Sequence, residues 1–227
     1  SMQKIVVFTG AGVSAESGIK TFRDHDGLWE NHKISEVATP DAWRQNPKLV
    51  LDFYNERRKQ LLSAKPNQAH KLIAQLQGKY DVHVITQNID DLHEKAGSKK
   101  VIHLHGELMK CRSTLNPNLI YTLKSWKLNI GDKCELGSQL RPHVVWFGEA
   151  VPNMEIAYEV ASKADVFIVV GSSLTVYPAA GLVNFVSNNS KKYLIDPSDI
   201  NIQDVENLII YKEKASSGME KLASEFL

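Results

Sequence analysis

Four short, uninterrupted apolar runs place the strongest constraint on how this chain of 227 residues can fold. The runs cover residues 5–8, 82–86, 166–170 and 193–195. Each is followed by a polar or glycine-containing loop, and helix-like stretches such as residues 67–77 and 154–162 lie between them. Continuous apolar strands that alternate with helices are typical of a parallel sheet buried on both faces. We therefore predict an α/β fold with a Rossmann-like, doubly wound parallel sheet and a ligand site outside the carboxyl ends of its strands.

Two segments interrupt this alternation and predict a second, smaller lobe. The first looks helical, and the second mixes Asn, Pro, Gly and Lys without a strong periodicity. We assign residues 29–77 and 108–140 to the inserted small lobe, and residues 1–28, 78–107 and 141–227 to the sheet domain.

Composition excludes several classes of protein. Lys and Arg number 27 against 26 Asp and Glu, a formal net charge of +1, whereas nucleic-acid binders usually carry a clear basic excess. No apolar run approaches the roughly 18 residues that span a bilayer. Cys111 and Cys134 are the only cysteines, so no disulfide framework is expected. We predict a cytoplasmic protein with no nucleic-acid partner and no membrane span.

A glycine-rich turn follows the first apolar run. Gly10, Gly12 and Ala15 occupy the fixed positions of the G-x-G-x-x-G/A pattern. Glycines there let the backbone approach a pyrophosphate, although such turns also occur for packing alone. A dehydrogenase would place an acidic residue about 20 positions further on, after a second strand, but residues 24–29 look like a loop that enters a helix. The turn favours a nucleotide site and argues against hydride transfer.

Polar side chains follow the second apolar run. Gln87, Asn88 and Asp90 stand at the carboxyl end of that predicted strand. They can hydrogen-bond ribose hydroxyls, a carboxamide or an ordered water. The alternative is a helix cap formed by Asn88 or Asp90, and the segment taken alone does not separate the two.

Two histidines stand at strand spacing in His103-Leu104-His105. Their side chains would point to opposite faces, so at most one can face a given cleft. A lone histidine is more often structural than catalytic. His105 is the better catalytic candidate because Gly106 follows it and leaves room for a substrate, and because an imidazole suits proton abstraction near neutral pH.

Five segments together resemble the sirtuin family. In chain order they are residues 10–23, 86–97, 105–106, 141–149 and 171–180. They come in the family's order and span almost the whole chain, which makes the resemblance specific. Residues 26–30 and 53–58 are most similar to the bacterial CobB-type deacylases of that family.

The resemblance implies an enzyme that uses NAD to remove acyl groups from lysines of protein substrates, with nicotinamide and an O-acyl-ADP-ribose as products. His105 would help to deprotonate a ribose hydroxyl, and Asn88 and Asp90 would complete the catalytic set. The residues expected to contact NAD are Gly10, Ala11, Gly12, Ser14, Ala15, Thr21, Phe22, Arg23, Gln87, Asn88, Ile89, Asp90, His105, Gly171, Ser172, Ser173, Asp196 and Ala215.

The expected substrate site has two parts. The substrate backbone would lie along Val145, Phe147 and Gly148 as an added strand, a mode that reads backbone shape more than side chains. Tyr54 and Arg57, three positions apart on a predicted helix, share a face. A hydroxyl and a guanidinium that converge on one pocket can bind a carboxylate, and the pair resembles that of sirtuins that remove succinyl and malonyl groups. Acetyl groups would be accepted as well. The alternative is a surface arginine packed along its helix.

The chain departs from the family at the zinc site. Most sirtuins hold a structural zinc on four cysteines of the small lobe, but here Ser113 stands where the first is expected, and Cys111 and Cys134 are the only thiols. Two thiolates cannot fill a closed tetrahedral site, and His143, the remaining option, lies inside the substrate motif. We predict a degenerate ribbon without bound zinc. The side chains expected to pack this segment instead are Tyr121, Leu123 and Trp126.

Two other functions stay open at this point. An ADP-ribosyltransferase or NAD hydrolase could use the same fold, and so could a nucleotide-binding module without catalysis. The presence of Asn88, Asp90 and His105 argues against the module, and the Tyr54–Arg57 pair favours an acyl-lysine substrate over the other two reactions.

Overall fold

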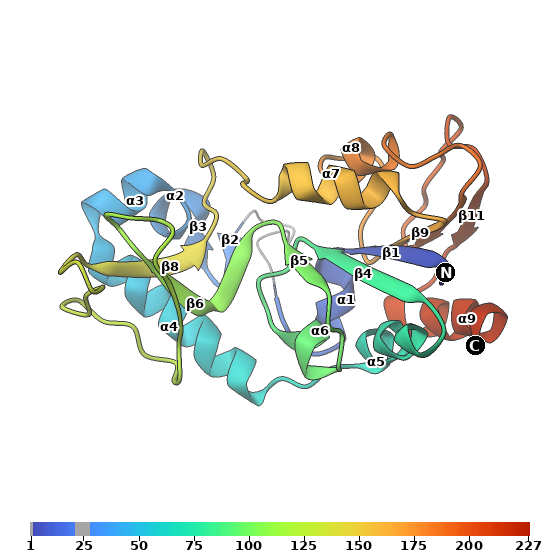
Figure 1. The fold of residues 1–227 in the computed structure, drawn as a ribbon. Helices are drawn as coiled ribbons and strands as arrows, with labels where there is room; N and C mark the ends of the chain where they lie inside the picture. Colours follow the sequence, from blue (N-terminus) through green and yellow to red (C-terminus); the bar gives the residue numbers. More distant parts are fainter. Residues whose placement is uncertain (1, 21–27) are drawn as a thin grey trace.

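A six-stranded, fully parallel sheet forms the larger part of the computed structural model, which describes residues 2–20 and 28–227 (Figure 1). The strand order is β11-β10-β9-β1-β4-β5, and every neighbouring pair is parallel. The strands are β1 (Lys4–Thr9), β4 (Asp81–Thr86), β5 (Val101–His103), β9 (Val166–Val170), β10 (Lys191–Ile195) and β11 (Leu208–Tyr211). The predicted doubly wound sheet is confirmed.

Helices cover both faces of this sheet (Figure 1). On one face lie α5 (Gln68–Gln75) and α9 (Ala215–Phe226), and on the other α7 (Met154–Ser162) and α8 (Ala179–Val183). Successive side chains of β1 point to opposite faces of the sheet: Val7 packs in the α5–α9 layer and Phe8 in the α7–α8 layer. A central strand buried on both sides must be apolar without a break, which explains the runs.

The edge strand β11 was not predicted, and the strand implied by the spacing of His103 and His105 ends at His103, so that His105 lies in the turn after β5. β5 has only three residues, and in β11 the side chains of Ile209 and Ile210 are 42% and 39% exposed. Strands of this length and exposure carry little of the apolar signal that marks the central four.

A smaller lobe combines helices with an antiparallel sheet of order β7-β6-β8. Its elements are a short hairpin of β2 (Leu28–Trp29) and β3 (His32–Lys33), the helices α2 (Ile34–Val37), α3 (Pro40–Gln45) and α4 (Pro47–Ser63), and the strands β6 (Gly106–Ser113), β7 (Ile120–Thr122) and β8 (Leu140–Val144). Helix α4 begins cleanly because the Asn46 side chain accepts the Leu49 N–H at 3.1 Å and Pro47 occupies the first turn. Its buried face packs Phe53 and Tyr54 against Trp146.

Two lobe boundaries differ from the prediction. Helix α5, which we assigned to the small lobe, packs on the parallel sheet, where Leu72 and Ile73 join Ile5 and Val84. Strand β8, which we assigned to the sheet domain, pairs with β6. An amphipathic stripe shows that a helix packs against something but not against which surface, so residue pattern alone could not place α5. The first segment of the small lobe therefore ends with α4, and its second segment extends to the end of β8.

The register of the sheet brings the ends of four strands to one level. Thr9 pairs with both Thr86 and Val170, and Thr86 pairs with His103. The loops after β1, β4, β5 and β9 therefore start side by side. Within the described part of the chain, no helix is both long and apolar enough to cross a membrane.

Candidate active site at the carboxyl edge of the sheet

A cavity of about 500 Å³, here called the central cavity, lies where the carboxyl edge of the sheet meets the small lobe. It brings together side chains predicted for catalysis with those predicted for substrate binding. The predicted residues that line it are Tyr54, Arg57, Gln87, Asn88, Ile89, Asp90, His105, Val145, Phe147 and Gly148. Segments far apart in the sequence thus converge on one space.

The glycine turn after β1 crosses the loop after β9 at very short range. Gly12 donates its N–H to the Gly171 carbonyl at 2.9 Å, and Gly10 donates to Val170 at 3.0 Å. A Cβ on Gly12 would lie 2.7 Å from the Cα of Gly171, and one on Gly10 would lie 2.7 Å from the Cβ of Ser172. These glycines are required by loop packing, the alternative weighed for the motif. Because neither Gly12 nor Gly171 has a side chain, their backbone has no side-chain atoms of its own at the carboxyl edge of the sheet.

A buried polar network supports the loop after β4. The Ser14 hydroxyl donates to Asp90 Oδ2 at 2.6 Å, and the other Asp90 oxygen accepts the Leu92 N–H at 3.0 Å. Burial raises the pKa of the Asp90 carboxyl. The Asn88 amide donates to the Gly10 carbonyl at 2.9 Å, while its Oδ1 has no partner among residues 2–20 and 28–227. Asp90 thus forms an Asx turn ahead of the helix Leu92–Lys95, whose N-cap is Asp91 and has no side-chain cap bond. Asn88 offers an acceptor to the central cavity.

His105 has its tautomer set by the backbone. Its Nδ1 lies 3.2 Å from the carbonyl oxygen of Gln87, and since a carbonyl only accepts, Nδ1 carries the hydrogen. The lone pair of the neutral imidazole is then on Nε2, as a general base requires. The two histidines diverge, because His103 is absent from the lining of the central cavity and lies in a separate one.

Tyr54 and Arg57 reach the central cavity from α4. Tyr54 is fully buried, and its hydroxyl accepts the indole N–H of Trp146 at 3.0 Å. Burial raises the pKa of that hydroxyl, so it stays protonated. The Arg57 guanidinium lies 4.7 Å from the ring centre of Phe53 and 3.9 Å from the Glu30 carboxylate, with its side chain 12% exposed. This is not the surface arginine of the alternative reading.

Residues 145–149 form a loop after β8 rather than a strand. The Val145 N–H is bonded to the His105 carbonyl at 2.8 Å, and the Phe147 N–H to the Ala38 carbonyl at 3.0 Å. The Phe147 residue is 50% exposed, and Gly148 has a φ of +92°. The segment lines one side of the central cavity, and four of its five backbone N–H groups, all but that of Gly148, are bonded within the chain.

Sequence reasoning missed the residues that hold this loop. Arg141 donates two N–H groups to Glu149 at 2.8 and 3.0 Å, and Glu149 also accepts the Trp146 backbone N–H at 2.8 Å. The Arg141 guanidinium stacks 3.6 Å from the Trp146 ring. An arginine, a tryptophan and a glutamate within nine positions were a usable signal, because a buried indole N–H and a half-buried carboxylate both need partners.

Other predicted NAD contacts lie away from the central cavity. Asp196 follows β10, and its carboxylate accepts the N–H two residues on at 3.1 Å. Ala215 begins α9 and is 3% exposed, so only its backbone is available. Ala11 and Ala15 are the first and last residues of the short helix after β1, and Ser173 lies in the loop after β9. The predicted contacts Thr21, Phe22 and Arg23 fall outside the described residues.

The ribbon segment of the small lobe does not fit a closed zinc site. Cys111 is buried in an apolar cluster with Leu51 and Leu128, whereas Cys134 is paired with Ser113, whose hydrogen bond lowers the pKa of that thiol. No group of three metal-ligating side chains that includes either cysteine is found in the described ranges. Of the predicted packing side chains, Tyr121 and Leu123 pack against the Cys111 cluster, and Trp126 lies beneath the Lys59 ammonium.

Comparison with known proteins identifies the family. A model described as the Sir2 family matches residues 10–178. A Bacteroides thetaiotaomicron protein named NAD-dependent protein deacylase is 50% identical over 226 residues, covering 97% of each chain. A Helicobacter pylori protein of the same name is 50% identical over 226 residues, covering 100% of this chain and 98% of its own.

Solved structures agree. A Sir2 homologue complexed with NAD is 40% identical with a TM-score of 0.86, covering 100% of this chain and 90% of the other. A mutant Sir2 homologue complexed with ADP-ribose is 39% identical with a TM-score of 0.87, covering 100% and 92%. The chain therefore belongs to the Sir2 family, as its resemblance to the sirtuins predicts.

Proposed function

We propose that this chain removes acyl groups from the lysines of protein substrates in an NAD-dependent reaction, and that it accepts succinyl and malonyl groups as well as acetyl. One observation carries the proposal: His105, with its base lone pair on Nε2, lines the same cavity as Tyr54 and Arg57. Relatives that are 50% identical and named NAD-dependent protein deacylase support the NAD-dependent part.

The residues at the sheet edge suit NAD. The crossing of Gly12 and Gly171 leaves no side chain over the backbone there, which a pyrophosphate needs for close approach. Within the central cavity, Asn88 Oδ1 can accept from a carboxamide or a hydroxyl. When bound, NAD would supply a sugar carbon activated by its nicotinamide leaving group.

His105 would act on a hydroxyl of the bound sugar. Its Nδ1–H is held by the Gln87 carbonyl, so Nε2 is the nitrogen that accepts the proton. The imidazolium formed keeps this hydrogen bond, and the carbonyl dipole stabilises its charge.

Tyr54 and Arg57 would select the acyl group. The Tyr54 oxygen already accepts from Trp146, so its own proton is directed elsewhere. Glu30 lies 3.9 Å from Arg57, a distance at which a substrate carboxylate competes well. Each charge-assisted hydrogen bond to such a carboxylate contributes roughly 1.5–3 kcal/mol. An acetyl group would leave the pair unused.

The substrate backbone would lie along residues 145–149. Since the N–H groups of Val145 and Phe147 are bonded within the chain, an added strand would pair through carbonyls of this segment and the Gly148 N–H. Contacts of this kind favour extended peptides with little side-chain selection.

The test is mass spectrometry of a succinyl-lysine peptide incubated with the purified chain and NAD, with nicotinamide measured in parallel. We expect loss of the succinyl group together with peptide-dependent nicotinamide release. Nicotinamide release without peptide would indicate an NAD hydrolase, a gain of ADP-ribose on the peptide would indicate a transferase, and no reaction would indicate a binding module. Any of these three overturns the proposal.

A further inference from the structure

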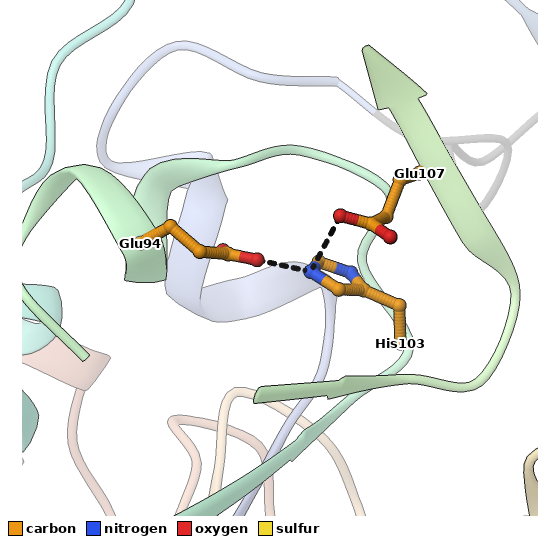
Figure 2. A group of neighbouring side chains, drawn as sticks. All are labelled: Glu94, His103 and Glu107. Atoms are coloured by element: carbon orange, nitrogen blue, oxygen red, sulfur yellow. Dashed lines mark hydrogen bonds and ion pairs between the residues drawn. The ribbon is translucent and has the colours of Figure 1, made fainter. Parts of the chain in front are cut away.

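A second cluster of ionisable side chains lies in a cavity separate from the central cavity. It consists of Glu94 on α6 (Leu92–Lys95), His103 at the end of β5 and Glu107 on β6, which point toward one another (Figure 2). One ligand atom from each lies within 4.8 Å of the others. We call this group the carboxylate–histidine cluster. The reaction proposed above uses none of its members.

The protonation of His103 follows from its neighbours. Its Nδ1 lies 2.9 Å from the backbone oxygen of Asn88, which only accepts, so Nδ1 carries a hydrogen. Its Nε2 faces two carboxylates, Glu94 Oε2 at 2.7 Å and Glu107 Oε1 at 3.8 Å. Two acceptors therefore converge on a nitrogen that, in the neutral ring, is itself an acceptor. A positive species must lie there, either a proton on Nε2 or a metal cation.

The surroundings favour a cation with an open coordination position. The His103 side chain is 5% exposed, whereas those of Glu94 and Glu107 are 38% and 24% exposed. The cluster is therefore buried at His103 and accessible to solvent at the two carboxylates. It lines a cavity of about 290 Å³. Lys110 pairs with Glu107 through Oε2 at 2.9 Å, which leaves Oε1 directed at His103.

His143 also lines this cavity but is not a ligand. Its Nδ1 is 3.2 Å from the Arg112 guanidinium, which can only donate, so Nδ1 accepts and the hydrogen of the neutral ring is on Nε2. Among residues 2–20 and 28–227, the ligand set is therefore one imidazole nitrogen and two carboxylate oxygens.

The geometry points to a zinc site formed by Glu94, His103 and Glu107, with water in the fourth position. Imidazole and carboxylate are common zinc ligands, and three protein ligands with one open position are the usual arrangement of an accessible site. A ligating histidine almost always donates its other N–H to a carbonyl or carboxylate, as His103 does to Asn88.

Bound zinc would act on the central cavity through that hydrogen bond. A cation on Nε2 strengthens the Nδ1–H as a donor and fixes the Asn88 backbone, whose side chain faces the central cavity. The site would therefore couple metal availability to the order of the loop that carries Asn88 and Asp90. Zinc binding itself does not depend on the proposed deacylase reaction.

The test is calorimetric titration of the metal-stripped full chain with Zn²⁺. We expect one site, weakened at least about tenfold by Glu94→Gln and by Glu107→Gln. Both carboxylates are partly exposed, so neither change is expected to unfold the chain, and circular dichroism checks this. Co²⁺ in place of zinc should show visible bands without a thiolate charge-transfer band.

Two control variants separate this site from other ligands. Cys134→Ser removes the thiol of Cys134, and His83→Gln removes a second histidine–carboxylate pair, in which His83 lies 3.1 Å from Asp81. Both should bind Zn²⁺ like the unaltered chain. Three results would overturn the site: no binding by the unaltered chain, binding by both glutamine variants as tight as that of the unaltered chain, or loss of binding in either control. His103 would then be an imidazolium paired with Glu94.

Discussion

Trp146 donates its indole N–H to the hydroxyl of Tyr54 at 3.0 Å, across the junction of the 145–149 loop and α4. The bond occupies the Tyr54 oxygen as an acceptor and leaves its proton for another group. Because burial raises the pKa of Tyr54, that proton is retained throughout the neutral range. Tyr54 is thus set as a donor, beside a cation, in a cavity that a charged acyl group could enter.

Arg57→Met should discriminate between acyl groups. The change removes the guanidinium but keeps an apolar side chain against Phe53. We expect kcat/KM for a succinyl-lysine peptide to fall about 10- to 150-fold, the equivalent of 1.5–3 kcal/mol, with acetyl-lysine changed less than threefold. Lys48→Met, which removes a 76% exposed cation from the same helix, is the control. Equal losses for both peptides would refute a carboxylate-binding role.

Gly12→Ala should damage the cofactor edge of the sheet. The added methyl would lie 2.7 Å from the Gly171 Cα, where only backbone can move. Overpacking of this kind costs about 1–3 kcal/mol, so we expect a lower urea midpoint and weaker NAD binding by calorimetry. Gly78→Ala, at a position with no neighbour within 4 Å, is the control. If the two variants behaved alike, the loop crossing would not be the constraint that we describe.

Ser113→Ala should destabilise the small lobe. The Ser113 oxygen accepts the N–H groups of Leu115 and Asn116, both at 3.0 Å, and the residue is 2% exposed. Losing two partly buried hydrogen bonds, at about 0.5–1.5 kcal/mol each, costs about 1–3 kcal/mol, which denaturant unfolding would measure. Ser125→Ala removes a similar acceptor from an exposed turn, and it should change stability by less than about 0.5 kcal/mol. If Ser113→Ala lost no more unfolding free energy than Ser125→Ala, Ser113 would not stabilise the small lobe.

His70→Gln should reduce the loss of stability in acid. Burial lowers the pKa of His70 from 6.5 to about 4, and its Nδ1 accepts the Asn67 N–H at 3.1 Å as part of a helix cap. The unfolded chain binds this proton first, so stability is complete above about pH 6.5 and falls toward pH 4, by up to roughly 3 kcal/mol. Glutamine preserves the cap but does not titrate.

Urea unfolding at several pH values between 7 and 4.5 would measure this effect. The variant should lose less stability than the unaltered chain, although buried His93, whose pKa is also lowered, still contributes. An identical pH dependence in the two proteins would show that His70 is not the titrating group.

The strands and helices whose burial is visible in their residue types could be predicted. The β1 and β9 runs are apolar because both faces are covered, and α7 has the bounds expected from its pattern. The position of α5 and the edge strand β11 could not be predicted, because both depend on which surface of the folded chain is available for packing or pairing. That information is in tertiary contacts and not in local periodicity.

The same division holds for the site. Residue pattern and family resemblance predicted that His105, Asn88 and Arg57 belong to one site, and the structure places all three on the central cavity, while their roles stay predictions. The lone pair of His105 on Nε2 was not predicted, because it depends on the Gln87 carbonyl. Nor was the Trp146 bond to Tyr54, which joins residues 92 positions apart. Orientation is set by neighbours that only the fold supplies.

The most direct test of the account compares the unaltered chain with His105→Asn on one succinyl-lysine peptide. Mass spectrometry would quantify the peptide, nicotinamide and O-succinyl-ADP-ribose, and calorimetry would measure NAD binding. We predict that the unaltered chain forms free lysine and O-succinyl-ADP-ribose in equal amounts, while His105→Asn binds NAD but forms neither product. Turnover by His105→Asn at a rate close to that of the unaltered chain would contradict the account.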